Sequence, residues 1–384
     1  MARALYIHWP FCLKKCPYCD FNSHVRAGVD VDLWQKSLMA DMRHEAELAG
    51  GEPLTSIFFG GGTPSLMPPA LVAALLTEAE RLWGFAPGIE ITLEGNPSSV
   101  EAANYAALAT AGVNRVSLGL QALDDEALRF LRRLHDVSEG LKALEIAQQN
   151  FARVSIDLIY ARPGQSAEAW EAELLRAIAL GTGHLSLYQL TIEQGTRFAT
   201  MVRERQFAPL DDDNAADLFD LTRKITTLYG LPAYEVSNHA KPGERSAHNL
   251  AYWQYRDYIG IGPGAHGRRN GIATVRHRKP ENWLSAITEQ GHGIGESRVL
   301  GLGEMASEAL LMGLRLSEGI DLAELASRFN LPSENLCDTN RLAFLETQGL
   351  AWQRGSRIGV TEQGMPLLDA VLGELVPEEL VSGA

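Results

Sequence analysis

Short apolar runs alternate with amphipathic stretches through residue 190, and this alternation limits the folds open to the chain. Runs rich in β-branched and aromatic residues predict strands, whereas apolar residues at 3.6-residue spacing predict helices. The expected strands are 4–8, 55–60, 90–94, 115–120, 153–159 and 184–190. The expected helices are 32–48, 69–83, 99–111, 124–134, 138–149 and 167–180. Alternating strands and helices form parallel sheets, so the fold class is α/β, with a partial (β/α)6 TIM-like barrel favoured over an open doubly wound sheet.

The rest of the chain divides into two further parts. One helix is expected at 211–228, and the segment 231–300, rich in Gly, His and Asn, is expected to be irregular and site-forming. From residue 301 the pattern predicts three helices and then a hairpin with its turn at 354–356. This pattern is typical of a small helical, winged-helix-like domain. The predicted domains are therefore 1–230, 231–300 and 301–384.

Charge and hydropathy exclude several classes of partner. Winged-helix modules often bind DNA, but the net charge of −14 disfavours binding to a phosphate backbone, so a structural or docking role is expected and no nucleic-acid partner. No run approaches the roughly 18 apolar residues of a membrane-spanning helix, which leaves room only for peripheral membrane contact. The N-terminal residues lack a signal-peptide pattern, so a cytoplasmic location is expected.

Three of the four cysteines lie within eight positions, directly after the first expected strand. Clustered thiols in a chain with no leader pattern indicate metal or cluster ligands rather than disulfides. In a barrel, this loop lies at the C-terminal face, where catalytic and binding residues gather. Cys12, Cys16 and Cys19 are the candidate ligands, and a zinc site completed by His24 is the alternative. The remaining Cys337 is expected to be a core residue.

The spacing Cys-x3-Cys-x2-Cys after a first strand resembles that of the radical S-adenosylmethionine (SAM) superfamily. The resemblance implies that the three thiolates hold a 4Fe–4S cluster. It also implies that the amino and carboxylate groups of SAM bind the remaining iron, which has no protein ligand.

A glycine-rich turn, FGGGTPS, follows the second expected strand. Glycines let a backbone approach a ligand closely, and exposed N–H groups in such a turn can meet a carboxylate. The turn resembles the superfamily motif that meets the methionine amino group, in the GGGTP form of the coproporphyrinogen III dehydrogenase-like branch. Gly61, Gly62 and Thr63 are its candidate cofactor residues.

Polar residues accompany the later expected strands: Glu94 closes one strand, Gln121 follows the next, Arg133 lies in the helix after it, and Asp157 stands inside the strand 153–159. A buried charge needs a partner, so a salt bridge is the alternative to a cofactor role for each charged member. The resemblance implies that Glu94 binds the SAM ribose. It implies that the rest of the nucleoside and carboxylate site is lined by Gln121, Arg133 and Asp157. It also places three residues beside the cofactor: Tyr6, Thr191 and Ala265.

Two members of this branch are compatible with the motifs: the oxygen-independent coproporphyrinogen III dehydrogenase and the HemW-type heme chaperones. The dehydrogenase has a further cysteine where this chain has Phe21, and it has a long extension before the first strand. The segment HNLAYW (248–253) resembles HNxxYW, a motif associated with the chaperones. The resemblance therefore implies a chaperone that binds heme and transfers it to an acceptor hemoprotein. A radical enzyme acting on a porphyrinogen is the alternative, and whether SAM is cleaved stays open.

The chemistry of the HNLAYW segment agrees with heme binding. Histidine is a common axial ligand of heme iron, and tyrosine and tryptophan offer flat apolar surfaces. We expect His248, Tyr252 and Trp253 to help hold heme; the alternative is a hydrogen-bonded loop histidine beside two core aromatics. His239 and His266 are weaker ligand candidates. The basic residues of 268–279 would meet the heme propionates or form a solvated face.

Overall fold

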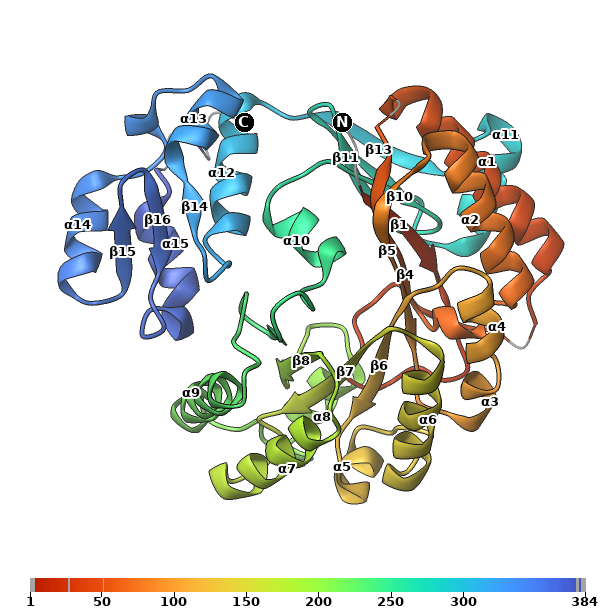
Figure 1. The fold of residues 1–384 in the computed structure, drawn as a ribbon, viewed down its shortest axis with the longest axis horizontal. Helices are drawn as coiled ribbons and strands as arrows, with labels where there is room; N and C mark the ends of the chain where they lie inside the picture. Colours follow the sequence, from red (N-terminus) through yellow and green to blue (C-terminus); the bar gives the residue numbers. More distant parts are fainter. Residues whose placement is uncertain (1–3, 27, 51, 378–379, 381–384) are drawn as a thin grey trace.

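One large sheet organises the chain in this computed structural model, which describes residues 4–26, 28–50, 52–377 and 380 (Figure 1). Its strand order is β13-β12-β11-β10-β1-β4-β5-β6-β7-β8-β9. The six predicted strands are confirmed as β1 (Ala4–Trp9), β4 (Leu54–Gly61), β5 (Phe85–Gly95), β6 (Arg115–Gln121), β7 (Arg153–Tyr160) and β8 (His184–Gln189). These strands pair in parallel and in sequence order, as in a barrel, whereas a doubly wound sheet reverses its order. Within the described residues the sheet does not close, so the barrel is partial.

Helices cover the outer face of this sheet (Figure 1). They are α1 (Val31–Ala49), α2 (Pro69–Trp83), α3 (Ser99–Ala102), α4 (Tyr105–Thr110), α5 (Asp125–Phe130), α6 (Val137–Asn150) and α7 (Ala167–Ala179). The helix expected at 99–111 is divided between α3 and α4. The helix expected at 124–134 ends early, because Arg132 adopts a left-handed conformation with φ 54° that a right-handed helix cannot continue.

The two faces of the barrel strands differ in polarity. Side chains alternate along a strand, so Ile91 and Leu93 of β5 point toward the apolar core beneath the helices. Their neighbours Glu90, Thr92 and Glu94 lie on the opposite, inner face. Because the inner face carries charged and hydroxyl groups, it is where binding chemistry is built.

The expectation that 231–300 is irregular is wrong. After α8 (Arg197–Arg203) and α9 (Asp212–Leu228), the segment forms β9 (Asn238–Ala240), α10 (Ala247–Trp253), β10 (Tyr258–Ile261), β11 (His266–Arg269), β12 (Ile272–Arg276), α11 (Pro280–Gln290) and β13 (Ile294–Val299). β10 pairs in parallel with β1, and β11–β13 continue the sheet as an antiparallel meander. Short strands that contain glycine and arginine lack the apolar alternation by which a strand is recognised.

Buried ion pairs explain how arginines fit in these strands. Arg276 contacts Glu45 of α1 at 2.6 Å, and Arg269 contacts the same carboxylate at 2.7 Å. Arg276 also pairs with Asp41 at 3.3 Å. Neither expectation for the basic segment, propionate binding or a solvated face, holds for these two arginines.

The C-terminal part contains the predicted three helices and hairpin. They are α12 (Leu302–Gly313), α13 (Leu322–Phe329), α14 (Thr339–Thr347), β15 (Ala351–Arg354) and β16 (Arg357–Val360), joined by β14 (Ile320–Asp321) and α15 (Leu368–Leu375). Short 3-10 turns lie at Pro64–Leu66, Ser333–Asn335 and Met365–Leu367. Cys337 is 1% exposed in the core of this part, as predicted. In the described residues no helix is long and apolar enough to cross a membrane.

Candidate cofactor site

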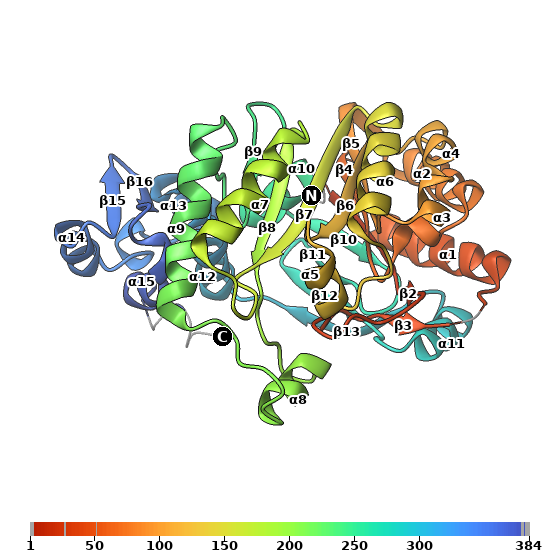
Figure 2. The same cartoon turned by 90° about the horizontal axis from the view of Figure 1, so that it is seen from below.

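The cysteine loop lies beyond the carboxyl ends of the barrel strands. β2 (Phe11–Cys12) and β3 (His24–Val25) pair and close the loop, and Figure 2 shows both at the opposite end of the sheet from β9 and α10. Cys12, Cys16 and Cys19 are free thiols that line one cavity of about 400 Å³. The loop therefore brings the three predicted ligands to one place, at the barrel end where binding sites form.

Two donors from the barrel reach the thiols. Thr63 Oγ1 donates to Cys12 Sγ at 3.5 Å, and Arg133 Nη1 donates to Cys16 Sγ at 3.3 Å. Burial raises the pKa of both Cys12 and Cys19, because a thiolate is poorly solvated there. The hydroxyl of Thr63 partly offsets that cost at Cys12, and the hydroxyl of Ser23 does so at Cys19, which favours the thiolate form that binds iron.

The glycine-rich turn holds the cysteine loop. The N–H of Gly62 donates to Trp9 O at 2.7 Å, and that of Thr63 donates to Phe11 O at 2.9 Å. A Cβ on Gly62 would lie 2.7 Å from Phe11 O, so only glycine permits this approach. The N–H of Gly61 donates to Glu94 at 3.3 Å. The expectation that these N–H groups are exposed is wrong, because all three are bonded within the chain.

Two half-buried carboxylates, those of Glu94 and Asp157, face the same cavity. Burial and the nearby Asp157 raise the pKa of Glu94 to about 8. Burial also raises the pKa of Asp157, to which Ser117 Oγ donates at 2.9 Å. Among the described residues no ion pair forms to either carboxylate, so the salt-bridge alternative finds no support. Half-buried carboxylates with so few partners and raised pKa values are candidate ligand acceptors.

Arg133 lies between these carboxylates and the thiols. Its Nη2 group donates to Gly119 O at 3.1 Å and to Asn96 Oδ1, while its buried Nε finds no partner in the described chain. A buried donor without a partner suits an anionic ligand group. Asn96 was missed by the sequence reasoning; its only signal is the Asn-Pro pair directly after the third barrel strand.

The structure brings together most of the predicted cofactor residues. The first cavity is lined by Cys12, Cys16, Cys19, Gly61, Gly62, Thr63, Glu94, Gln121, Arg133, Asp157 and Thr191. Gln121 enters it from a left-handed backbone with φ 67°, a strained conformation that is found mainly at functional sites. Ala265 is buried and does not line this cavity.

The zinc alternative fits the geometry less well. His24 Nε2 makes its hydrogen bond with Asn22 Oδ1 at 3.3 Å. In the described part of the chain no three His, Cys, Asp or Glu side chains surround a single-ion position. A cluster of several irons spreads its ligands more widely than one ion does. The thiols together with the guanidinium beside them suit such a cluster.

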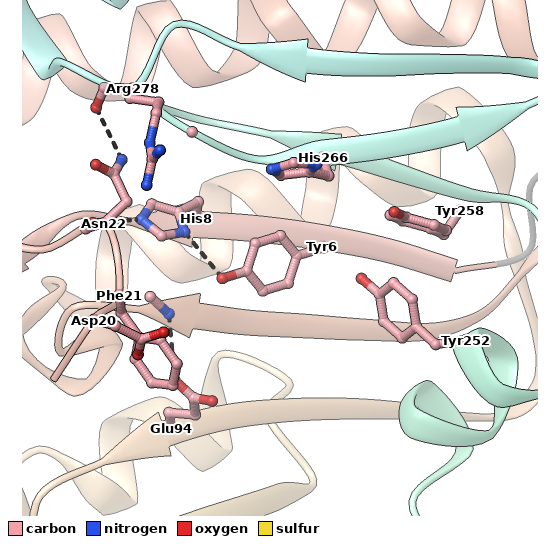
Figure 3. Close-up of a pocket in the computed structure, with 12 residues that line it drawn as sticks. Tyr6, His8, Asp20, Phe21, Asn22, Glu94, Tyr252, Tyr258, His266 and Arg278 are labelled. Carbon is pink, nitrogen blue, oxygen red and sulfur yellow. Dashed lines mark hydrogen bonds between the residues drawn. The ribbon is translucent and has the colours of Figure 1, made fainter. Parts of the chain in front are cut away.

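A second cavity, of about 330 Å³, adjoins the first (Figure 3). Phe21, Gly61 and Glu94 line both cavities. The second cavity is walled mainly by rings, from Tyr6, Tyr252, Tyr258 and His266, together with His8. Tyr6 thus lines this cavity and not the cysteine cavity. The sequence reasoning missed Tyr258 and His8, which lie outside the motifs that it used.

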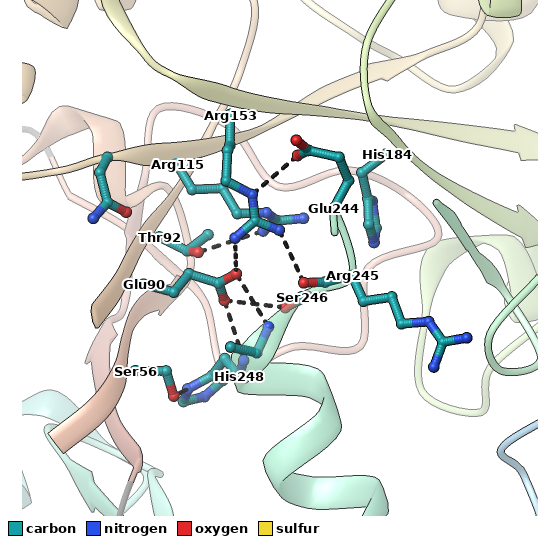
Figure 4. A network of polar contacts seen from close by, with 12 residues as sticks. Ser56, Glu90, Thr92, Arg115, Arg153, His184, Glu244, Arg245, Ser246 and His248 are labelled. Atoms are coloured by element: carbon teal, nitrogen blue, oxygen red, sulfur yellow. Dashed lines mark hydrogen bonds and ion pairs between the residues drawn. The ribbon is translucent and has the colours of Figure 1, made fainter. Parts of the chain in front are cut away.

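The HNLAYW segment forms the short helix α10 at the amino ends of the strands (Figure 4). Glu90 accepts hydrogen bonds from the N–H groups of Ala247 and His248, both at 3.1 Å. Arg153 pairs with the same carboxylate at 2.7 Å. Because Glu90 belongs to a barrel strand, these bonds anchor the start of α10 to the inner face of the sheet.

The three predicted heme residues of α10 point in different directions. His248 is 2% exposed, and its ring nitrogens contact Ser56 Oγ at 3.1 Å and Tyr252 OH at 3.3 Å. Burial lowers the pKa of His248 to about 3. Tyr252 lines the second cavity, whereas Trp253 lies under the guanidinium of Arg315, 5.0 Å from its ring centroid. A heme role for these residues stays a prediction, and of the three only Tyr252 lines either of the two cavities.

The partial barrel and its three-cysteine loop are typical of radical SAM proteins. Comparison with known proteins agrees with this class. The family model for the radical SAM superfamily matches residues 6–176, and the model for the HemN C-terminal domain matches residues 302–367. The solved structure of Escherichia coli coproporphyrinogen III oxidase (HemN), a radical SAM enzyme, matches with a TM-score of 0.82 at 22% identity. That match covers 97% of this chain and 89% of the other.

Proteins of similar sequence indicate which family within the superfamily the chain belongs to. The Escherichia coli heme chaperone HemW is 35% identical over 96% of this chain and 97% of its own length. The mitochondrial radical S-adenosyl methionine domain-containing protein 1 of Mus musculus is 38% identical over 98% of this chain and 87% of its own length. The chain therefore belongs to the radical SAM superfamily, in the family that includes the HemW heme chaperones.

Proposed function

We propose that this protein is a heme chaperone, which binds heme and transfers it to an acceptor hemoprotein. The observation that carries the proposal is the second cavity: tyrosine and histidine rings line it beside the cysteine cavity. Aromatic walls suit a flat macrocycle. The relatives named heme chaperone HemW, which match almost the whole chain, support the same function.

We propose further that the first cavity holds a 4Fe–4S cluster and SAM. Cys12, Cys16 and Cys19 would hold the cluster. When bound, the cluster supplies electrons and an open iron site for SAM. Arg133 would offset the negative charge of the thiolates, and its buried Nε would donate to the carboxylate of SAM. Glu94 would accept hydrogen bonds from the ribose hydroxyls.

α10 has a positioning role in this proposal. Glu90 and Arg153 fix the start of the helix. The ring of His248 is hydrogen-bonded to Tyr252 OH, and this bond orients the tyrosine. Tyr252 then presents its ring to the second cavity. The buried contacts of α10 thus fix the position of Tyr252, which lines the cavity that would meet heme.

The alternative is a radical enzyme that acts on a porphyrinogen. The observation in its favour is that Glu94 borders both cavities, so a substrate in the second cavity would lie beside SAM. Anaerobic reconstitution of the cluster, heme titration and a parallel coproporphyrinogen III assay separate the two functions. Tight heme binding without decarboxylation supports the chaperone, whereas decarboxylation of coproporphyrinogen III would select the enzyme.

A further inference from the structure

Three histidines of the segment 231–300 are candidate heme ligands, and the structure separates them. His239 is 1% exposed and its ring contacts Thr226 Oγ1 at 2.9 Å. Both ring nitrogens of His248 are engaged, as described above. His266 is exposed, lines the second cavity, and makes no hydrogen bond through its ring within the described residues. Of the three, His266 alone offers a free imidazole nitrogen to a ligand in a cavity.

The surroundings of His266 suit one edge of a flat anionic ring system. In Figure 3 its ring stands beside Tyr258, with Tyr6 and Tyr252 on the facing side of the cavity. Arg278 is exposed and also lines the cavity. The neighbouring Arg276, in contrast, is buried and pairs with Asp41 and Glu45, so its guanidinium is not available to a ligand.

We propose that His266 is the axial iron ligand of a heme that enters this cavity edge-first, with Arg278 paired to a propionate. The inference rests on the proposed heme-chaperone function and assigns its site. Because the imidazole–iron bond uses a neutral nitrogen, the protonation state of His266 matters. Burial and the nearby Arg278 lower the pKa of His266, which favours the neutral ring near pH 7.

The exposure of the cavity explains why the heme would be releasable. Three of its lining residues, Phe21, His266 and Arg278, are exposed, so part of the macrocycle would remain at the surface. There it would lie against Phe21, whose side chain is 61% exposed. One protein ligand and a half-exposed macrocycle suit a carrier, because transfer then requires only one iron–protein bond to break.

The test is a heme titration of the full-length, cluster-loaded protein, followed by the Soret band. His266→Ala is expected to weaken heme binding at least tenfold and to shift the Soret band. Added imidazole is expected to restore the wild-type band by filling the vacated iron position. His266→Met is expected to keep heme with a shifted spectrum, because a thioether replaces the imidazole.

The matched control is His292→Ala. His292 lies between α11 and β13, its ring centroid is 4.2 Å from that of His44, and it does not line the cavity. Its replacement is expected to leave heme binding unchanged. Arg278→Ala is expected to weaken heme binding several-fold, and Arg278→Lys to restore part of the loss.

The outcomes distinguish a wrong ligand assignment from a wrong proposed function. If the wild type binds heme and His266→Ala binds it with the same affinity and spectrum, the ligand assignment is wrong while the chaperone function stands. If the wild-type protein binds no heme, both the assignment and the proposed function are wrong. Cluster content and SAM affinity, expected to match the wild type in each variant, show that the variants are folded.

Discussion

Two glutamates on the inner face of β5 lie four residues apart, and their surroundings are opposite. Burial alone would raise the pKa of Glu90, but Arg115, the N–H groups of α10 and Arg153 outweigh it and hold that pKa below its usual value. Burial and Asp157 raise the pKa of Glu94 to about 8, and one backbone donor opposes them. A buried carboxylate with cations and donors around it organises the fold. One that faces a cavity with few partners is available for a ligand.

The largest expected effect concerns the three cysteines at the carboxyl ends of the barrel strands. Replacing Cys12, Cys16 or Cys19 by Ala is expected to abolish the 4Fe–4S signal, because two thiolates cannot hold the cluster. Iron and sulfide content with electron paramagnetic resonance after anaerobic reconstitution measures this. Cys337→Ala is the matched control and should leave the cluster intact, since Cys337 lies in the separate C-terminal core. Loss of the cluster in that control would contradict the three-ligand model.

The second prediction concerns the network around Glu90 that anchors the start of α10. Glu90→Ala removes the carboxylate that pairs with Arg153 at 2.7 Å and lies beside Arg115, although Arg153 keeps its ion pair with Glu244 at 3.0 Å. Removing one member of a buried ion pair costs about 3–5 kcal/mol of unfolding free energy, so the loss is expected to approach that range. Glu94→Gln is expected to cost little or to stabilise the protein without cofactors, because it removes a half-buried carboxylate that has no cation partner among the described residues. Urea unfolding of both variants tests the contrast. Equal losses would show that the two carboxylates do not differ as proposed.

The third prediction concerns ligand binding at the cavity end. Glu94→Ala is expected to weaken SAM binding by about 1.5–3 kcal/mol, the scale for losing a hydrogen bond to a charged group. Calorimetry with SAM on the cluster-loaded protein measures the change. Cluster content should match the wild type, because thiolates rather than carboxylates hold the iron. Unchanged SAM affinity would remove the ribose role from Glu94.

The fourth prediction is a pH dependence of the stability of the protein without cofactors. The pKa of Glu94 rises from 4.5 to about 8 on folding, so the native state holds a proton that the unfolded chain releases. The stability of the protein without cofactors should therefore fall as pH rises from about 4.5 to about 8. Thermal unfolding at pH 5 and pH 8 should show a larger fall in melting temperature for the wild type than for Glu94→Gln. Equal falls in the two proteins would contradict a raised pKa at this site.

Much of the barrel and of the cofactor cavity was predictable from the sequence, because the signals are local. Alternation of apolar runs and helical spacing located the six parallel strands, and the cysteine spacing located the loop after β1. Residues at strand ends, such as Glu94 and Asp157, were predicted to gather because parallel strands end at one edge. The strands β10–β13 were missed, because glycines and arginines conceal their alternation.

The sequence by itself determined which residue types stand after each strand, and therefore the class of cofactor that the cavity suits. Only the tertiary structure decided which charges are paired. Nothing in the local sequence shows that Glu90 is paired and Glu94 is not, or that His248 is buried and His266 is exposed. Glu90 meets Arg153 and the start of α10, whereas Glu94 meets a cavity. The difference arises because partners more than 60 residues away in the chain, such as Arg153, are brought to one inner face by the sheet.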